Sequence, residues 1–304
     1  MAVDFKGRVA IVTGAGGGLG REHALALAAR GAKVVVNDLG GARDGSGSSL
    51  TAAQAVVEEI RAAGGEAIAN GASVTDFSAV QAMVAETIEQ WGRIDILINN
   101  AGILRDKTFA KMEIEDFKLV MDVHLMGAVH CCKAVWPHMT EQKYGRIVMT
   151  TSSSGLYGNF GQSNYGAAKL ALVGLMQTLA IEGAKYDIRV NSLAPTAATR
   201  MTESLFPAEF LQALKAADVV PAMLVLAAEE APTRAILCAG AGSFEAANIT
   251  LTQGIWVGRG SDAPEQLAAR LAEVRLRDGE TVPDSGAAQG HLELTKAMSN
   301  VQKT

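Results

Sequence analysis

Cysteines, aromatic residues and strong net charge are all scarce in this chain. Its three cysteines, Cys131, Cys132 and Cys238, fit neither a metal-ligand spacing nor a Cys-x-x-Cys pair. We therefore expect no metal site, and we interpret the cysteines as buried small hydrophobic residues in a reducing compartment. Aromatic residues make up 5% of the chain. The core must therefore rest mainly on Ala, Val, Leu and Ile.

Strong positive charge and long apolar runs are also missing. A net charge of -5 provides no basic field for nucleic acid, so we expect no nucleic-acid partner. No uninterrupted apolar run is long enough to span a bilayer. Residues 1–6 run directly into a predicted strand without room for a signal peptide, and residues 301–304 are not a Ser-Lys-Leu peroxisomal address. These absences predict a soluble cytoplasmic protein with no membrane partner.

What the chain does contain is a regular alternation of short apolar runs and longer amphipathic stretches. The predicted strands are 8–13, 33–38, 66–70, 94–98, 145–149, 188–191 and 235–238. The predicted helices are 19–30, 51–63, 76–90 and a long stretch from residue 113 onwards. This alternation predicts right-handed βαβ units. The expected fold is a Rossmann-type, doubly wound α/β fold, with a mostly parallel sheet and helices on both faces.

Two stretches depart from the alternation. Residues 40–49 (GGARDGSGSS) form a polar, glycine-rich loop, and beyond Gly240 the regular pattern fades. Residues 264–277 still look helical and carry several arginines. Because no repeat or linker is visible, we expect one Rossmann domain over residues 1–240, with residues 241–304 as a C-terminal extension of the same domain.

A glycine-rich turn, residues 13–20 (TGAGGGLG), joins the first predicted strand to the first predicted helix. Side chains there would keep a cofactor pyrophosphate away from the backbone N–H groups, and a helix N-terminus adds a partial positive charge. Structural turns also use glycine, so the turn is weak evidence when taken alone. Its place between a strand and a helix at the start of the chain indicates a nucleotide site.

Asp38 ends the second predicted strand. A carboxylate there can accept hydrogen bonds from the adenosine ribose hydroxyls and would repel a 2′-phosphate, which favours NAD over NADP. An acidic strand-end cap is the alternative interpretation. Arg43, in the loop that follows, could bind a 2′-phosphate, so NADP remains the alternative cofactor.

Tyr165 and Lys169 lie four residues apart, which on a helix places both side chains on one face. An unperturbed tyrosine titrates near pH 10, and a fixed ammonium beside it favours the phenolate. Lowering the pKa by about three units corresponds to roughly 4 kcal/mol and would make the tyrosine an effective acid–base group. A lone Tyr-x-x-x-Lys is nevertheless common on protein surfaces.

Two further features accompany this pair: Ser152, thirteen residues before Tyr165, and the sequence Asn99-Asn100-Ala101-Gly102 after the fourth strand. With the Thr-Gly-x-x-x-Gly-x-Gly turn, they resemble the short-chain dehydrogenase/reductase family over about residues 7–240. The resemblance implies that Ser152 holds the substrate oxygen, Tyr165 transfers its proton, and Lys169 binds the nicotinamide ribose. The cofactor-binding positions that it implies are Gly14, Gly18, Leu19, Gly20, Asp38, Ser73, Val74, Asn100, Tyr165, Lys169, Ala198 and Thr199. It also implies a small-molecule substrate and a homodimer or homotetramer, paired through residues 113–140 and the Tyr165 helix.

Within the family, residues 36–41, 102–106 and 157–162 look like the dehydrogenase domains of peroxisomal multifunctional enzymes. That branch oxidises (3R)-hydroxyacyl-CoA and is also described as 17β-hydroxysteroid dehydrogenase. The resemblance implies NAD-dependent oxidation of a secondary alcohol, (3R)-3-hydroxyacyl-CoA to 3-oxoacyl-CoA, by a free-standing bacterial version. The alternatives are a hydroxysteroid dehydrogenase, an NADPH-dependent 3-oxoacyl thioester reductase, which Asp38 argues against, and a regulatory nucleotide-binding protein without chemistry.

The chain departs from the family pattern at three places. His124 stands where the family has asparagine, Pro195-Thr196 replaces Pro-Gly, and Ser73-Val74 replaces Asp-Val. Since the asparagine works largely through its backbone carbonyl, we expect His124 to be tolerated. Arginines of the extension could bind the phosphates of CoA, or could simply solvate an exposed helix. They are Arg259, Arg270, Arg275 and Arg277.

Overall fold

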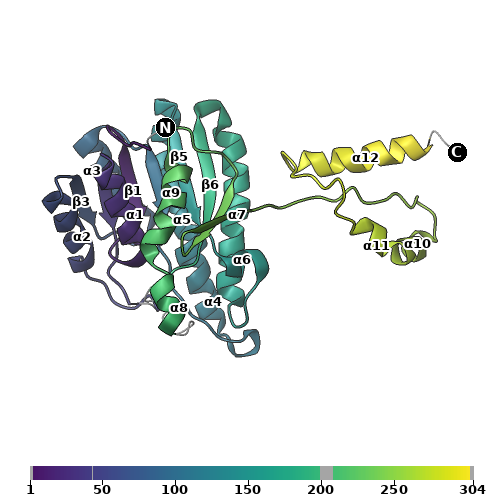
Figure 1. Ribbon diagram of the computed structural model, residues 1–304, viewed down its shortest axis with the longest axis horizontal. Coiled ribbons are helices and arrows are strands. Elements are labelled where there is room, and N and C mark those ends of the chain that lie inside the picture. The colour runs from purple at the N-terminus through teal and green to yellow at the C-terminus, as the bar shows by residue number, and fades with distance from the viewer. Residues whose placement is uncertain (1–2, 43, 199–207, 302–304) are drawn as a thin grey trace. The chain divides into compact units, whose positions relative to one another are not determined.

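The computed structural model describes residues 3–42, 44–198 and 208–301. The chain divides into two compact units, Met1–Ala246 and Ala247–Thr304. The first unit carries the sheet and its helices (Figure 1). The division falls near the predicted boundary at residue 240. That the second segment belongs to the same domain remains a prediction.

The first unit is built on an eight-stranded sheet in the order β3-β2-β1-β4-β5-β6-β7-β8. The strands are β1 (Val9–Thr13), β2 (Lys33–Asn37), β3 (Glu66–Asn70), β4 (Ile96–Asn99), β5 (Gly145–Thr150), β6 (Ile188–Pro195), β7 (Ile236–Gly240) and β8 (Ser243–Ala247). From β3 to β7 every neighbouring pair is parallel. In register, Val12 pairs with Val36 on one side and with Ile98 on the other. The predicted doubly wound α/β fold is confirmed.

Helices cover both faces of the sheet (Figure 1). One face carries α1 (Gly18–Ala29), α2 (Thr51–Ala62) and α9 (Val220–Ala227), and the other carries α3 (Phe77–Trp91), α5 (Gly127–Gln142) and α7 (Ser163–Gly183). Shorter elements of the first unit are η1 (Phe109–Lys111), α4 (Ile114–Met121), η2 (Asp122–Met126), α6 (Ser153–Tyr157), η3 (Ala184–Tyr186), α8 (Ala208–Ala213) and η4 (Ala216–Val219). Because both faces are covered, β1 and β5 are buried along their whole length.

Two helical stretches, residues 114–142 and 163–186, are apolar and long enough to cross a membrane by length and composition alone. Neither stretch is an uninterrupted apolar run, because polar side chains occur in both. Core helices of soluble proteins pass the same test, and 39% of each apolar window is buried against the rest of the chain. Both stretches pack on the sheet through α5 and α7.

The second unit holds α10 (Ala263–Ala269), α11 (Leu271–Val274) and α12 (Ala287–Val301). The helix predicted over 264–277 is divided into α10 and α11. The break lies at Arg270, whose φ of -111° and ψ of 17° are outside the helical region. Neither α12 nor β8 was predicted. β8 follows β7 after a turn in which Ala241 and Gly242 have φ of 50° and 76°.

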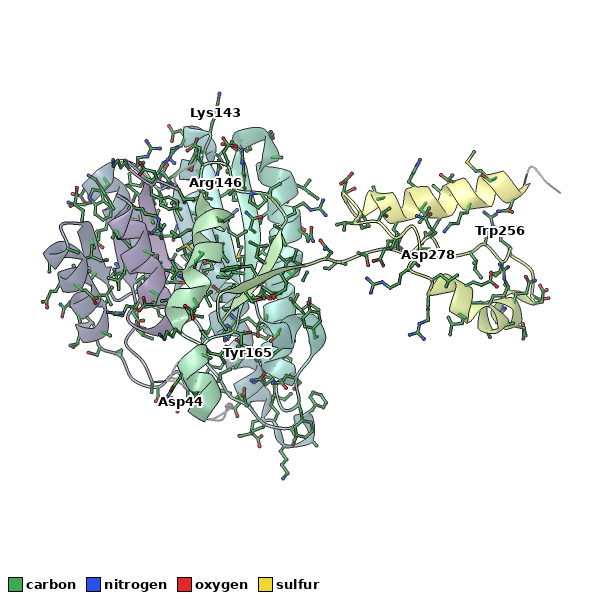
Figure 2. The ribbon with its side chains drawn as sticks, viewed as in Figure 1. Asp44, Lys143, Arg146, Tyr165, Trp256 and Asp278 are labelled. Carbon is green, nitrogen blue, oxygen red and sulfur yellow. The ribbon has the colours of Figure 1, made fainter. Side chains whose placement is uncertain are left out.

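Parallel strands end at one edge of the sheet, and this edge positions the site. The connections that follow β1, β2, β4, β5 and β6 all leave there, including the glycine turn and the loops after Asn37, Asn99 and Thr150. Ligands of open α/β sheets bind outside this edge. In Figure 2, Tyr165 lies at one end of the strands and Arg146, at the start of β5, lies at the other.

Candidate active site

The glycine turn between β1 and α1 is closely packed on its surroundings. Gly14 has φ of +63°, and a Cβ there would lie 2.8 Å from the Cα of Ala101. A Cβ on Gly20 would lie 2.2 Å from the carbonyl oxygen of Gly14. The Asn100 side chain fastens the turn to the end of β4, because its Nδ2 donates to the carbonyl oxygens of Thr13 and Gly14. Glycine is therefore required here for close approach, which is what a phosphate cradle needs.

Asp38 follows β2 and faces the turn. The N–H of Gly16 donates to its Oδ2 at 2.7 Å, and the N–H of Gly40 donates to its Oδ1 at 2.6 Å. Each carboxylate oxygen can accept more than one hydrogen bond. The backbone thus holds the carboxylate in place and leaves it capacity to accept ribose hydroxyls.

A cleft runs along this edge and brings most of the predicted cofactor residues together. Its lining includes the predicted Gly14, Gly18, Leu19, Asp38, Ser73, Val74 and Asn100. Gly20 lies behind the turn, where its backbone supports Gly14. Ala198 is not among the lining residues; its N–H donates to the carbonyl oxygen of Leu214. Thr199 and Arg43 lie outside the described residues.

The residues that line the cleft fit a dinucleotide. The cleft has glycines at the N-terminus of α1, where a pyrophosphate would lie. It also has a fixed carboxylate, that of Asp38, where the ribose hydroxyls would lie. That the predicted residues bind a cofactor remains a prediction; the structure places seven of them around one cleft.

A second pocket adjoins this cleft and shares Leu19, Asn100 and Gly102 with it. Ser152, Tyr165 and Lys169 all line this pocket, so the structure brings the three predicted catalytic residues together. Ser152 is the N-cap of α6, and its Oγ accepts from the N–H of Ser154 at 3.2 Å. It also hydrogen-bonds with Tyr165. This geometry lets one substrate oxygen meet both hydroxyls.

Burial sets the protonation of the catalytic pair. It raises the pKa of Tyr165 to about 12, although the hydrogen bond with Ser152 lowers the pKa and the negative charge of Asp106 raises it. Burial likewise lowers the pKa of Lys169 to about 7. The Lys169 Nζ lies 5.5 Å from the Tyr165 ring centroid and donates to the carbonyl oxygen of Thr150 at 2.5 Å. The predicted lowering of the Tyr165 pKa is therefore not produced by these protein groups, since desolvation outweighs the distant ammonium.

Sequence reasoning missed a polar chain in the wall of the second pocket. The Gln162 Nε2 donates to the Asp106 carboxylate at 2.8 Å, and its Oε1 accepts from the Ser154 hydroxyl at 2.8 Å. Oε1 also accepts from Asn159 Nδ2 at 3.0 Å. No spacing rule indicates that Gln162 reaches Asp106, 56 residues earlier.

His124 also lines the second pocket, from within the π-helix η2. Its ring packs edge-on to the Tyr165 ring, with centroids 5.2 Å apart. Its Nε2 lies 2.8 Å from the Ile103 carbonyl oxygen. The sequence led us to expect that histidine can replace asparagine here because only the backbone carbonyl matters. In the structure the His124 side chain makes contacts of its own.

Two arginines of the second unit form hydrogen bonds with carboxylates. Arg270 forms two hydrogen bonds with the carboxylate of Glu273, and Arg277 does the same with Glu280. The CoA role of these arginines remains a prediction. Across residues 3–42, 44–198 and 208–301, no group of three or more His, Cys, Asp or Glu side chains could hold a metal ion.

Comparison with known proteins gives a consistent result. Residues 8–209 match the family model for short chain dehydrogenases. A short-chain type dehydrogenase/reductase of Mycobacterium tuberculosis is 49% identical over 279 residues, covering 90% of this chain and 96% of the relative. The peroxisomal multifunctional enzyme type 2 of Drosophila melanogaster is 54% identical over 225 residues, covering 74% of this chain and 37% of that enzyme.

Solved structures agree. The full-length Drosophila melanogaster multifunctional enzyme type 2 superposes with a TM-score of 0.79 at 37% identity, over 98% of this chain and 50% of that one. A 7α-hydroxysteroid dehydrogenase complexed with NADH and 7-oxo glycochenodeoxycholic acid superposes with a TM-score of 0.71 at 30% identity, over 79% of this chain and 96% of that one. This chain thus spans nearly all of one relative and about a third to a half of the multifunctional enzyme.

Proposed function

The chain belongs to the short-chain dehydrogenase family, and on that premise we propose that it oxidises the secondary alcohol of a (3R)-3-hydroxyacyl-CoA to a ketone, with NAD as the electron acceptor. The family makes it an oxidoreductase rather than a regulatory nucleotide-binding protein. The observation that carries the proposal is the pocket in which Ser152, Tyr165 and Lys169 adjoin the cofactor cleft. The resemblance to the multifunctional enzymes supports the choice of substrate.

Each of the three residues has a distinct task in this proposal, and that of Lys169 is to bind the nicotinamide ribose. The Ser152 hydroxyl holds the substrate oxygen, and Tyr165 Oη accepts the proton that leaves that oxygen as the alcohol becomes a ketone. Bound NAD supplies the acceptor for the hydride and a positive charge beside the reacting atoms. Because burial raises the pKa of Tyr165 to about 12, the tyrosine is protonated at neutral pH, and oxidation should accelerate as the pH rises. The reverse reduction should be favoured at lower pH.

NAD is proposed over NADP because of Asp38. The carboxylate is fixed by Gly16 and Gly40 at the rim of the cleft, where it can accept ribose hydroxyls and would repel a 2′-phosphate. The related 7α-hydroxysteroid dehydrogenase structure holds NADH, which is consistent with this choice. A cytoplasmic location and a homo-oligomeric state remain predictions for this chain.

A hydroxysteroid substrate is the second candidate. The observation that favours it is the likeness to the 7α-hydroxysteroid dehydrogenase complexed with a 7-oxo bile acid. Both candidates require the same oxidation at a secondary alcohol, so the catalytic residues do not separate them. The difference lies in the part of the substrate beyond the reacting carbon.

One steady-state experiment separates these functions. The full chain is assayed with (3R)- and (3S)-3-hydroxyacyl-CoA and with a panel of steroid alcohols, each with NAD and with NADP. The proposal expects the highest kcat/KM for a (3R)-acyl-CoA with NAD, and Tyr165→Phe supplies the inactive control. A higher kcat/KM for a steroid, or for NADP, would contradict the substrate or the cofactor assignment respectively.

A further inference from the structure

His124 is the buried histidine beside the catalytic tyrosine. It is 3% exposed, and its ring packs edge-on to Tyr165. It lies in the π-helix Asp122–Met126, which separates α4 from α5. Short π-helical turns inside helices often occur at functional sites. The location alone does not distinguish an acid–base role from a structural one, but the hydrogen bonds do.

The Nε2 atom of His124 meets both polar groups of one backbone residue. It lies 2.8 Å from the carbonyl oxygen of Ile103 and 3.1 Å from its amide nitrogen. A single imidazole nitrogen either donates or accepts, so one of these contacts dominates. The shorter contact, to the carbonyl oxygen, favours the tautomer that carries the proton on Nε2; the contact to the amide nitrogen would need Nε2 unprotonated. Nδ1 is buried without a partner among the described residues, as expected of the unprotonated nitrogen.

The residues held by this contact form the strip Gly102–Leu104, which lies between the two pockets. Gly102 and Ile103 line the cofactor cleft, and Gly102 and Leu104 line the pocket that holds Tyr165. A Cβ on Gly102 would lie 2.3 Å from His124 Cε1, so the ring fits directly against the strip. The imidazole is thus in contact with the strip on one side and with Tyr165 on the other.

We propose that His124 is a positioning residue, a neutral imidazole protonated on Nε2 that fixes the strip Gly102–Leu104 and the Tyr165 ring relative to each other. It does not exchange protons with the substrate, because its donor is committed to Ile103. Burial and the nearby charge of Lys169 both lower its pKa well below the usual value, and this keeps the ring uncharged at neutral pH. The side chain, and not only the backbone, therefore contributes to the site.

The first test is ¹⁵N NMR of the full wild-type chain labelled at histidine. At least two of the five imidazoles, those of His124 and His23, should remain neutral from about pH 5.5 to pH 8.5. The neutral signal that disappears in His124→Gln should be the one with its proton on Nε2. An imidazolium at pH 7, or a proton on Nδ1, would overturn the proposal. This measurement needs neither a substrate nor activity.

The second test compares two variants of His124. Glutamine can place a side-chain N–H near the position of Nε2, whereas phenylalanine keeps the ring and loses the donor. His124→Phe should lower kcat by roughly tenfold, because it removes one hydrogen bond at the site and supplies no other donor. His124→Gln should retain most of kcat, with equal melting temperatures for the two variants. Equal kcat values for the two variants would contradict a positioning role. So would loss, in both variants, of the expected rise of the oxidation rate with pH.

The third test uses the contact with Gly102. Gly102→Ala adds only a methyl group but should lower kcat at least tenfold, because the methyl would displace His124. In a His124→Ser background, which removes the ring, the same Gly102→Ala change should cost little. Gly290→Ala in α12 is the control, since a Cβ there would have no heavy atom within 4 Å. Additive losses in the double variant would show that ring and strip act independently.

Discussion

The backbone N–H of Gly16 donates a 2.7 Å hydrogen bond to Oδ2 of Asp38, so the glycine turn itself holds the carboxylate that faces the cofactor cleft. A Cβ on Gly16 would lie 2.8 Å from that same oxygen. The glycine turn and the carboxylate for which we propose phosphate and ribose binding are therefore one structure, built from the ends of β1 and β2. A change at Asp38 should affect both the affinity for the cofactor and the choice between cofactors.

Asp38→Ala should weaken NAD binding about tenfold or more, because a charge-assisted hydrogen bond contributes about 1.5–3 kcal/mol. It should also narrow the preference for NAD over NADP. Asp38→Asn keeps the size of the side chain and removes the charge, and should mainly relieve the repulsion of a 2′-phosphate. Dissociation constants from fluorescence titration with NADH and NADPH check both effects. Tighter binding of NADPH than NADH by the wild-type chain would contradict the assignment.

Tyr165→Phe should lower turnover by about a hundredfold to ten-thousandfold, as expected when a general acid–base group is lost. Cofactor binding should stay nearly intact, because the ring remains and only the hydroxyl is removed. The measurement is kcat with NADH affinity on the same preparation. A variant that retains most of its turnover would refute the role of Tyr165.

Because His23 is buried, we expect the free energy of unfolding to fall at acid pH. His23 is fully buried in α1, neither ring nitrogen has a hydrogen-bond partner among the described residues, and burial lowers its pKa from 6.5 to about 4. The unfolded chain therefore binds a proton as the pH falls below 6.5, while the folded chain resists protonation until about pH 4. The free energy of unfolding should drop over this window by up to roughly 3 kcal/mol on account of His23.

The test is urea unfolding at pH 7.5 and pH 4.5. His23→Leu should show a smaller loss of stability between these pH values than the wild type, because it removes the group that titrates. The matched control is His291→Leu, at an exposed position in α12. If His23→Leu and the wild type lose the same free energy, His23 does not cause the acid sensitivity.

Oligomerisation is predicted through the outer face of α7. Leu170 and Ile181 are 46% and 50% exposed, which is costly for large apolar side chains in a monomer. Leu172 and Val173, on the same helix, are instead buried in the chain's own core. Sedimentation should show a dimer or tetramer, and Leu170→Glu with Ile181→Glu should dissociate it. Val225→Glu, on α9 at the opposite face of the sheet, should not; a wild-type monomer at micromolar concentration would refute the prediction.

The arginines of the second unit can be tested against the CoA part of the substrate. If they bind its phosphates, Arg259→Ala and Arg275→Ala should raise KM for the hydroxyacyl-CoA several-fold and leave the pantetheine analogue unaffected. Arg270→Ala and Arg277→Ala are the comparison, because these two are already engaged by Glu273 and Glu280. Equal effects on both substrates, or none, would assign these residues to a solvated surface.

The sequence alone determined the order of the strands from β1 to β7, because apolar periodicity reports directly which strands are buried on two faces. It indicated the proposed catalytic trio for a different reason. Ser152, Tyr165 and Lys169 lie at fixed local spacings on one strand end and one helix, so their proximity depends on little beyond that local structure. It likewise indicated Asp38, because the carboxyl end of β2 must lie beside that of β1 in such a sheet.

Only the tertiary structure decided how these groups behave. The raised pKa of Tyr165 and the lowered pKa of Lys169 depend on burial, which spacing does not report. The contact of His124 with Ile103 depends on the π-helical turn, which no periodicity rule indicated, and the link from Gln162 to Asp106 depends on loops that meet across the fold. Sequence patterns determine which residues share a face or an edge. Desolvation and long-range contacts exist only once the chain has packed.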